Sequence, residues 1–376
     1  MLDDNRKYLT DKQLEILIDG IHYDGTLIYK EKSEWISCVG QRSNGKSFFW
    51  LGICVIEFFE FGYQIGYVRR QKEEVTNAGI EEYFSDVNFL KWLKENYGFD
   101  GVMQKEKKLY FYACDDEGKI IKEQNTLFGK AFSLSTARNN KSLHYDLIEN
   151  IIFEEFITDG TYLTSPPEWK RWNNLMSTIF RDRKGRVILI GNTIERNCPY
   201  FREMGVNILK LKQGTTTKFK SPDNIDFIVE YTGYNPNKKN QMFVGQSAKQ
   251  INKGEWDSNV YPHLFVELDT VEKIYKFYYC CNEFCFKCEC FIYEDKKFIF
   301  VRPYDKEDLE FNYYDDIFEK GFHFETNYFN YCKKNRHKKI WDIFLNNRVV
   351  YSDNLCGTEF NNCLKYFNPF ITSRRL

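Results

Sequence analysis

The stretch Gly40-Gln41-Arg42-Ser43-Asn44-Gly45-Lys46-Ser47 decides the fold of this 376-residue chain. It matches the pattern G-x-x-x-x-G-K-[ST] at every position, between a strand-like run at 35–39 and an apolar, helix-like run at 48–59. In such a P-loop, the backbone N–H groups of the loop and of the following helix bind the phosphates of ATP. Lys46 then places its charge on the transferred phosphoryl group, and Ser47 ligates Mg²⁺. We therefore predict that all eight residues contribute to ATP binding.

The composition is typical of a folded globular protein, with 43% hydrophobic and 28% charged residues. The first residues are polar and lack the apolar core of a signal peptide, and Glu57 and Glu60 interrupt the most apolar run. We therefore expect neither export nor a membrane span, and we expect the twelve cysteines to be reduced. The net charge of −1 restricts any contact with DNA to a local patch or channel.

Apolar strands that alternate with helical patterns predict an α/β core, in which helices cover both faces of a parallel sheet. Strands are expected at 35–39, 64–70, 150–156 and 186–193, a helix at 72–97 and a hairpin at 108–121. We expect an ATPase domain with its N-terminal lead-in at 1–205 and a smaller α+β domain at 265–376. The polar stretch at 206–264 is expected to be a linker or a small intermediate element.

A second motif, Glu154-Glu155, ends an apolar strand about a hundred residues after Lys46. ATP hydrolysis needs one acid to hold Mg²⁺ and another to orient and polarise the attacking water. We assign the metal to Glu154, although aspartate is commoner there, and the water to Glu155. Two adjacent acids indicate a P-loop ATPase of the additional-strand, catalytic-glutamate type, not a kinase or a GTPase. The alternative is that both acids only begin a solvated loop.

Four further polar residues are candidates because of their places beside the predicted strands. Asn192 ends the strand at 186–193, where it can contact both the γ-phosphate and the attacking water. Arg69 and Arg70 end the strand at 64–70, near the edge where open α/β sheets bind ligands. Arg181 precedes the strand at 186–193 and can reach the ATP of a neighbouring subunit. The alternatives are a strand-terminal asparagine and, for each arginine, a surface ion pair.

Taken in order, these motifs resemble the DNA-packaging ATPases of small, φ29-like tailed phages, which are relatives of the terminase large subunits. The resemblance is carried by GQRSNGKS at 40–47, GYVRRQK at 66–72, IFEEF at 152–156, NLMSTIFRDR at 174–183, GNT at 191–193 and NCPYF at 197–201. It covers residues 34–205 well and the remainder loosely.

The resemblance implies a homopentameric ring at the portal vertex of a viral procapsid in the cytoplasm of the infected host cell. Such a ring uses ATP and Mg²⁺ to translocate double-stranded DNA into the procapsid, and a structural RNA is a further candidate partner. By this likeness Arg181 is a trans-acting arginine finger, Lys72 also reaches across the interface, and Arg42 matches the arginine of the family's loop.

The resemblance also implies that the C-terminal domain is a vestigial, nuclease-like (RNase H-like) domain. A two-metal nuclease needs a cluster of convergent carboxylates. The acids at strand-like positions (Glu294, Asp295, Asp305 and Asp353) form no recognisable set, so we predict no cleavage.

Two other functions remain open from the residues. The first is another nucleic-acid-dependent P-loop ATPase, of the helicase or partition type, although helicase motifs are not visible after residue 205. The second is a binding module that uses its P-loop as a nucleotide switch, which the pair Glu154-Glu155 argues against.

Cysteines and basic residues gather in a few segments. Cys285 and Cys288 form one C-x₂-C pair, which is half of a zinc site, but the alternation in FCFKCECF at 284–291 favours packing within a strand. The basic segments at 136–142, 333–339 and 373–376 are candidates for DNA contact. Each of them can equally be an ordinary solvated segment.

Overall fold

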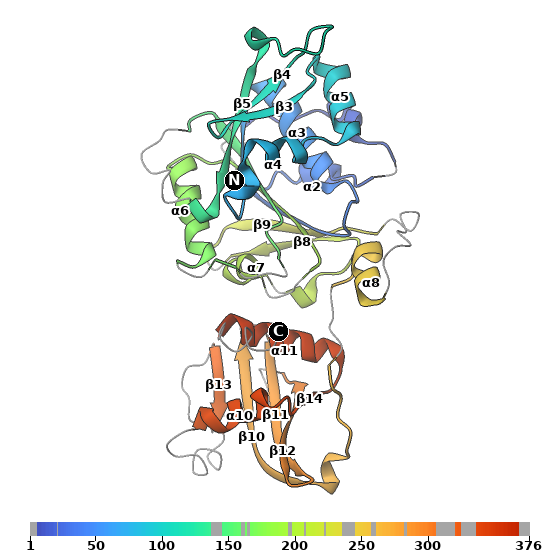
Figure 1. The fold of residues 1–376 in the computed structure, drawn as a ribbon, viewed down its shortest axis with the longest axis vertical. Coiled ribbons are helices and arrows are strands. Elements are labelled where there is room, and N and C mark those ends of the chain that lie inside the picture. Colours follow the sequence, from blue (N-terminus) through green and yellow to red (C-terminus); the bar gives the residue numbers. More distant parts are fainter. Residues whose placement is uncertain are drawn as a thin grey trace. The chain divides into compact units, whose positions relative to one another are not determined.

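A large, mostly parallel sheet organises the first part of the chain (Figure 1). The computed structural model describes residues 6–20, 22–136, 145–158, 162–163, 166–194, 198–206, 208–221, 223–234, 245–256, 261–281, 284–305, 320–324 and 336–367. Contacts between residues divide the chain into two units, Met1–Trp256 and Asp257–Leu376. Within the described residues, the sheet of the first unit has nine strands in the order β3-β4-β5-β2-β6-β7-β1-β9-β8.

The centre of this sheet is parallel, as the apolar runs predicted. Six neighbouring strands share one direction: β5 (Thr126–Ser133), β2 (Gln64–Arg69), β6 (Ile148–Glu154), β7 (Arg186–Asn192), β1 (Trp35–Gly40) and β9 (Asp226–Tyr231). The outer strands β3 (Gly101–Lys105), β4 (Lys108–Tyr112) and β8 (Thr215–Lys220) pair antiparallel. The carboxyl ends of the parallel strands therefore meet at one edge of the sheet, where such sheets bind ligands.

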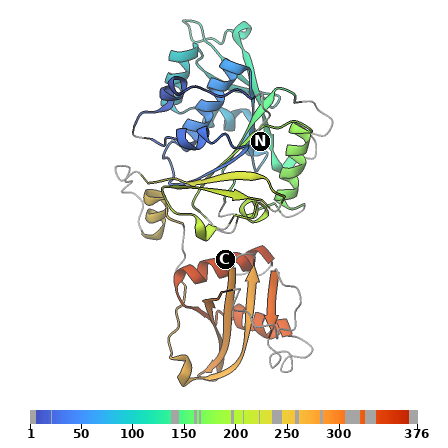
Figure 2. The same ribbon diagram turned by 180° about the vertical axis from the view of Figure 1, so that it is seen from behind.

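Helices cover both faces of the sheet (Figures 1 and 2). One face carries α1 (Asp11–Leu14), α2 (Thr26–Lys30), α3 (Lys46–Phe61), α4 (Asn77–Tyr83) and α5 (Val87–Tyr97), and the other carries α6 (Glu168–Phe180) and α7 (Pro199–Glu203). Alternate residues of one strand enter the two cores: Ile188 faces α3, whereas Leu189 packs with Trp172 of α6. Within the described part of the chain, no helix has the length and apolar character of a membrane span.

Short 3₁₀ helices complete the described elements: Glu15–Leu17, Glu73–Val75, Lys122–Gln124, Ile208–Lys210 and Leu268–Thr270. The single helix expected at 72–97 is in fact divided into a 3₁₀ turn, α4 and α5. Two side-chain caps explain the division, because Thr76 accepts a hydrogen bond from Gly79 N and Asp86 accepts one from Phe89 N.

The expectation that residues 206–264 form a linker or a separate small element is wrong for most of their described part. Strands β8 and β9 belong to the main sheet, and β9 pairs directly with the P-loop strand β1. Helix α8 (Gly245–Lys253) also lies in the first unit, which ends at Trp256. The segment looked like a linker because β8, TTTKFK, is largely exposed and carries no apolar run.

The second unit has a mostly antiparallel sheet with helices on one of its faces. Its strands, in the order β13-β10-β11-β12-β14, are Lys320–Phe324, Glu272–Cys281, Phe284–Tyr293, Lys296–Pro303 and Val349–Tyr351, and only the β12–β14 pair is parallel. Helices α10 (Arg336–Leu345) and α11 (Asn354–Phe367) contribute Phe344 and Phe360 to one apolar core with Phe277 and Tyr279 of β10.

The cysteines of the second unit belong to its sheet. Cys288 and Cys290 lie on the β11 face that packs against the helices, as the alternation predicted. Cys280 and Cys285 face each other on β10 and β11, with their sulfur atoms in close contact. Among the described residues there is no group of three His, Cys, Asp or Glu side chains that could hold a metal ion.

A buried carboxylate connects the P-loop helix to the two strands that end at the nucleotide edge. Glu57 of α3 accepts hydrogen bonds from Arg186 of β7 (2.9 Å) and Asn150 of β6 (2.8 Å), and also from Arg6 (3.1 Å) and Tyr29 (2.8 Å). Burial alone would raise the pKa of Glu57, but Arg186 and Arg6 hold it below its ordinary value.

Replacing Glu57 by glutamine is expected to destabilise the first unit, because Arg186 and Arg6 then lose their buried counter-charge. We expect Glu57→Gln to lower the free energy of unfolding by about 3–5 kcal/mol, as measured by urea denaturation. The control is Glu31→Gln, which removes an exposed ion pair with Lys218 and should cost less than about 1 kcal/mol. Equal effects of the two variants would contradict this account.

Candidate nucleotide-binding site

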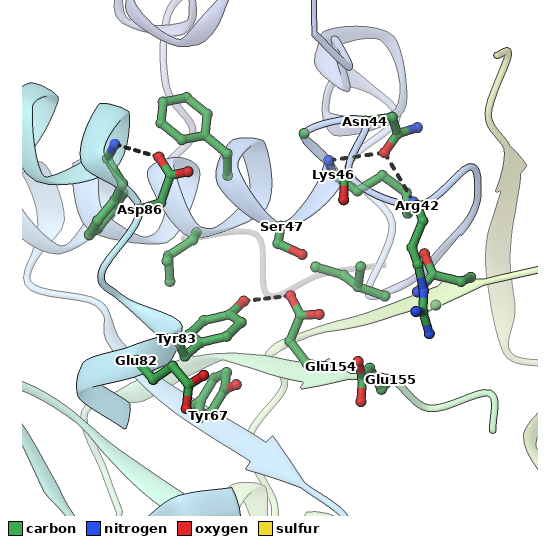
Figure 3. A pocket seen from close by; sticks show the side chains of 18 of the residues that line it. Arg42, Asn44, Lys46, Ser47, Tyr67, Glu82, Tyr83, Asp86, Glu154 and Glu155 are labelled. Carbon is green, nitrogen blue, oxygen red and sulfur yellow. Dashed lines mark hydrogen bonds between the residues drawn. The ribbon is translucent and has the colours of Figure 1, made fainter. Parts of the chain in front are cut away.

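A pocket with a volume of about 1020 Å³ opens at the carboxyl ends of β1, β2, β6 and β7 (Figure 3). Its walls come from the P-loop, from the ends of these strands, from α4 and α5, and from the N-terminal segment. Of the residues predicted from the sequence, the pocket brings together Arg42, Ser43, Asn44, Gly45, Lys46, Ser47, Arg69, Glu154, Glu155 and Asn192. The pocket is large enough for a nucleotide.

The glycines of the P-loop are required by close contacts and by backbone conformation. A Cβ atom on Gly40, whose φ is 155°, would lie 1.9 Å from Oγ1 of Thr232. Gly45 has a φ of 99°, and a Cβ there would lie 2.9 Å from Cβ of His22. Helix α3 begins at the next residue, Lys46, so the free N–H groups of its first turn face the pocket.

Lys46 is buried and bound to its own loop. Its Nζ donates hydrogen bonds to the carbonyl oxygen of Gln41 (2.5 Å) and to Oδ1 of Asn44 (3.0 Å). Burial lowers the pKa of Lys46 to about 8. A phosphate group would offer this ammonium a charged acceptor, which forms stronger hydrogen bonds than a neutral carbonyl.

Glu154 ends β6 as a buried carboxylate at the base of the pocket. Tyr83 donates a hydrogen bond to its Oε1 (2.5 Å), and Ser47 lines the same pocket. Burial raises the pKa of Glu154, and the hydrogen bond from Tyr83 opposes that rise. A serine hydroxyl beside a carboxylate is the oxygen donor set that Mg²⁺ prefers, so Ser47 and Glu154 fit the predicted metal role.

Glu155 follows β6 in a left-handed backbone conformation, with a φ of 55°. Its carboxylate is half exposed and accepts a hydrogen bond from Nη2 of Arg69 (2.9 Å), which also contacts Glu74 (2.5 Å). Arg70 points elsewhere: it pairs with Glu168 (3.0 Å) and donates to the carbonyl oxygens of Glu155 and Phe156. Only the first of the two adjacent arginines therefore belongs to the pocket.

The end of β7 carries Asn192 into the pocket, as predicted. The next residue, Thr193, is buried behind the P-loop, where its N–H donates to the carbonyl oxygen of Gly40 (3.4 Å). The strand that carries Asn192 is thereby attached to the strand that carries the loop.

Four predicted residues do not line the pocket. Gly40 and Gln41 lie behind the loop, and Lys72 is exposed beside Arg69. Arg181 is exposed at the C-terminal end of α6, before the start of β7, and thus lies at the opposite edge of the parallel sheet from the pocket. The structure therefore separates Arg181 from the P-loop of its own chain.

Sequence reasoning missed two segments that contact the P-loop. In the N-terminal segment, Tyr23 N donates to the carbonyl oxygen of Asn44 (2.8 Å), and the paired side chains of Asp19 and His22 line the pocket. These residues follow no motif, so no pattern could have identified them.

The second segment lies at the end of α8. The carbonyl oxygen of Gly254 accepts hydrogen bonds from Oγ1 of Thr193 (2.8 Å) and from the hydroxyl of Tyr231 (2.7 Å). Nε2 of Gln41 donates to the carbonyl oxygen of Asn252 (2.7 Å). Gly254 has a φ of 67°, and a Cβ there would lie 2.6 Å from Gln41 N. The one feature of the sequence that could have indicated this contact is an isolated glycine after a polar, helix-like stretch.

Comparisons with known proteins agree with these motifs. The chain is 28% identical over 240 residues to the DNA packaging protein of Bacillus phage phi29, an alignment that covers 58% of this chain and 65% of that protein. It is 33% identical over 172 residues to the DNA packaging protein of Bacillus phage B103, covering 45% and 47%. The chain thus spans less than two thirds of the length of these relatives.

A solved structure, the bacteriophage Phi-29 viral genome packaging motor assembly, shares the fold with a TM-score of 0.54 and 20% identity, over 93% of this chain and 99% of that chain. The Podovirus DNA encapsidation protein (Gp16) family matches residues 22–259, which include every pocket-lining residue except Asp19 and also include the segment at the end of α8. Since this match covers more than half of the sequence, the chain belongs to the Podovirus DNA encapsidation protein (Gp16) family.

Proposed function

We propose that this chain is the ATPase of a viral DNA-packaging motor, and that it hydrolyses ATP to translocate double-stranded DNA into a preformed procapsid. The observation that carries this proposal is the meeting of Lys46, Ser47, Glu154 and Glu155 in one pocket. The names of the phage relatives, each a DNA packaging protein, support the substrate.

In the proposed mechanism, the loop residues bind the β- and γ-phosphates, and Lys46 exchanges the carbonyl oxygen of Gln41 for a phosphate oxygen. Ser47 and Glu154 would hold Mg²⁺, which would neutralise charge on the phosphates. Glu155 accepts a proton from the water that attacks the γ-phosphorus, and the bond to the bridging β–γ oxygen breaks to release ADP and phosphate. Asn192 orients the water, and Arg69 binds at the phosphate edge beside Glu155.

We propose that the chain works as a ring, a homopentamer by its resemblance, in which Arg181 and Lys72 act on the ATP of the neighbouring subunit. The support is positional, because Arg181 lies at the edge of the sheet opposite its own P-loop. An arginine supplied in trans stabilises the charge that develops in the transition state. The ring would act at the portal vertex of the procapsid, in the cytoplasm of the infected host cell, with a structural RNA as a candidate partner.

The alternative of a helicase with tandem motor domains is less well supported, because the sheet of the second unit is mostly antiparallel. We propose that the second unit is instead a vestigial nuclease-like domain that does not cut DNA. Glu294 and Asp295 lie before β12 and Asp305 lies after it, at opposite ends of that strand. Asp353 caps α11 by accepting a hydrogen bond from Cys356 N (2.8 Å).

The basic segments proposed for DNA contact cannot be placed from the described residues. Residues 373–376 and all of 136–142 except Thr136 lie outside them, as do residues 333–335. Residues 336–339 form the start of α10.

Glu155→Gln tests the catalytic assignment. Glutamine keeps the size of the side chain but cannot accept a proton, so we expect phosphate release to fall by at least about 10²-fold while ATP affinity is retained. DNase protection of DNA incubated with procapsids and ATP should be lost as well. Glu203→Gln, at an exposed carboxylate outside the pocket, is the control and should retain both activities. Normal turnover by Glu155→Gln would refute the assignment.

Mixing two inactive variants tests whether Arg181 acts in trans. Arg181→Ala subunits keep an intact pocket, and Glu155→Gln subunits keep an intact arginine, so mixed rings should recover part of the ATPase rate. Lys46→Ala mixed with Glu155→Gln is the matched control, because no subunit then has an intact pocket and no recovery is expected. If Arg181→Ala gives no recovery at any ratio although the subunits co-assemble, the trans role is wrong.

A further inference from the structure

The acidic residue that ends β6 is a glutamate, and its long side chain can adopt several orientations of the carboxylate. Compared with aspartate, Glu154 has one more methylene group and one more rotatable bond. Holding such a side chain in a single conformation costs conformational entropy, which only a contact in the folded protein can offset. Glu154 is buried, with 6% of its surface exposed, so any such contact must come from the walls of the pocket.

Tyr83, the last residue of α4, supplies this contact. Its hydroxyl donates to Oε1 of Glu154 at 2.5 Å, and Ser47 lines the same pocket. Figure 3 shows Tyr83 and Ser47 approaching Glu154 from different sides, Tyr83 from α4 and Ser47 from the start of α3. A tyrosine hydroxyl keeps its proton at neutral pH, so it acts as the donor in this hydrogen bond.

The position of the Tyr83 ring does not depend on Glu154. The ring lies 4.8 Å from the ring of Tyr67 on β2 and 5.1 Å from that of Phe84, measured between centroids. Helix α4 is itself fixed, because Ile80 and Phe84 are buried in the core and Thr76 caps its first turn. The hydroxyl is therefore presented from a rigid support, which is what orienting a metal ligand requires.

We propose that Tyr83 is a positioning residue for the metal of Mg–ATP: it holds one oxygen of Glu154 so that the other is directed toward the metal beside Ser47. The proposal rests on the proposed ATPase function. Tyr83 itself touches neither the metal nor the nucleotide. A shorter aspartate at 154 would lie out of reach of the hydroxyl, so this tyrosine is matched to the glutamate.

The test uses the full-length chain and measures metal binding without turnover. Binding of Mn²⁺, as a probe for Mg²⁺, is followed by electron paramagnetic resonance in the presence of a non-hydrolysable ATP analogue. Tyr83→Phe keeps the ring and removes only the hydroxyl. We expect its Mn²⁺ dissociation constant to rise by about 10-fold, the loss typical of removing a group that orients a metal ligand. The affinity of Tyr83→Phe for a fluorescent ATP analogue in the presence of EDTA should stay within about twofold of the affinity of the wild-type protein.

Tyr29→Phe is the matched control. It also removes a buried hydrogen bond from a tyrosine to a glutamate, Glu57, but does so outside the pocket (2.8 Å). Any general loss of stability should therefore appear in both variants, whereas the change in Mn²⁺ affinity should appear only in Tyr83→Phe.

A second comparison uses Glu154→Asp. An aspartate at position 154 does not reach Tyr83. The double variant Glu154→Asp/Tyr83→Phe should therefore have an Mn²⁺ dissociation constant within about twofold of that of Glu154→Asp alone. In the wild-type background, by contrast, Tyr83→Phe should raise the dissociation constant as stated above. An unaltered Mn²⁺ affinity in the single variant Tyr83→Phe would overturn the proposal. So would an equal loss of ATP affinity in EDTA, since Tyr83 would then contact the nucleotide directly. A failure of the proposed function would give a different result: the wild-type protein would bind Mn²⁺ and ATP but would not hydrolyse ATP.

Discussion

The buried charge of Glu57 is the constraint on which the nucleotide site depends. A carboxylate without access to water requires charged or hydrogen-bonding partners, and here they come from β6, β7 and the N-terminal segment. Because Glu57 lies on α3, this requirement fixes the P-loop helix against the two strands that end in Glu154 and Asn192. Apolar packing alone would allow a helix to shift slightly along a sheet, whereas a buried ion pair restricts such shifts because its atoms must stay within hydrogen-bonding distance.

Two adjacent carboxylates at the end of β6 lie in different environments, and this difference separates their roles. Glu154 is buried and accepts a hydrogen bond from the neutral hydroxyl of Tyr83, which suits a ligand that must face a cation. Glu155, turned by its positive φ, is half exposed and pairs with Arg69. In general, two neighbouring carboxyl groups can take different chemical roles when their environments differ.

The sequence predicted whatever depends on local pattern. Residues of the P-loop, Glu154, Glu155 and Asn192 line one pocket because each lies at or just after the end of a short apolar strand, and parallel strands end at one edge. What it missed depends on contacts between distant residues. The pairing of β9 with β1 and the close approach of Gly254 to Gln41 join residues separated by well over a hundred positions. Arg69 and Arg70 were indistinguishable in sequence, yet neighbouring side chains at a strand end point to opposite faces, toward Glu155 and toward Glu168.

The contacts of Gly254 have a mechanical consequence. Trp256 is the last residue of the first unit, so the backbone that continues into the second unit leaves from a point held by Thr193, Tyr231 and Gln41. The segment after α8 is therefore attached by hydrogen bonds to the P-loop and to the strand end that carries Asn192. Gln41 takes part twice: its carbonyl oxygen accepts a hydrogen bond from Lys46, and its side chain donates one to the carbonyl oxygen of Asn252. The phosphate loop is thus also the attachment point of the last described segment of the first unit.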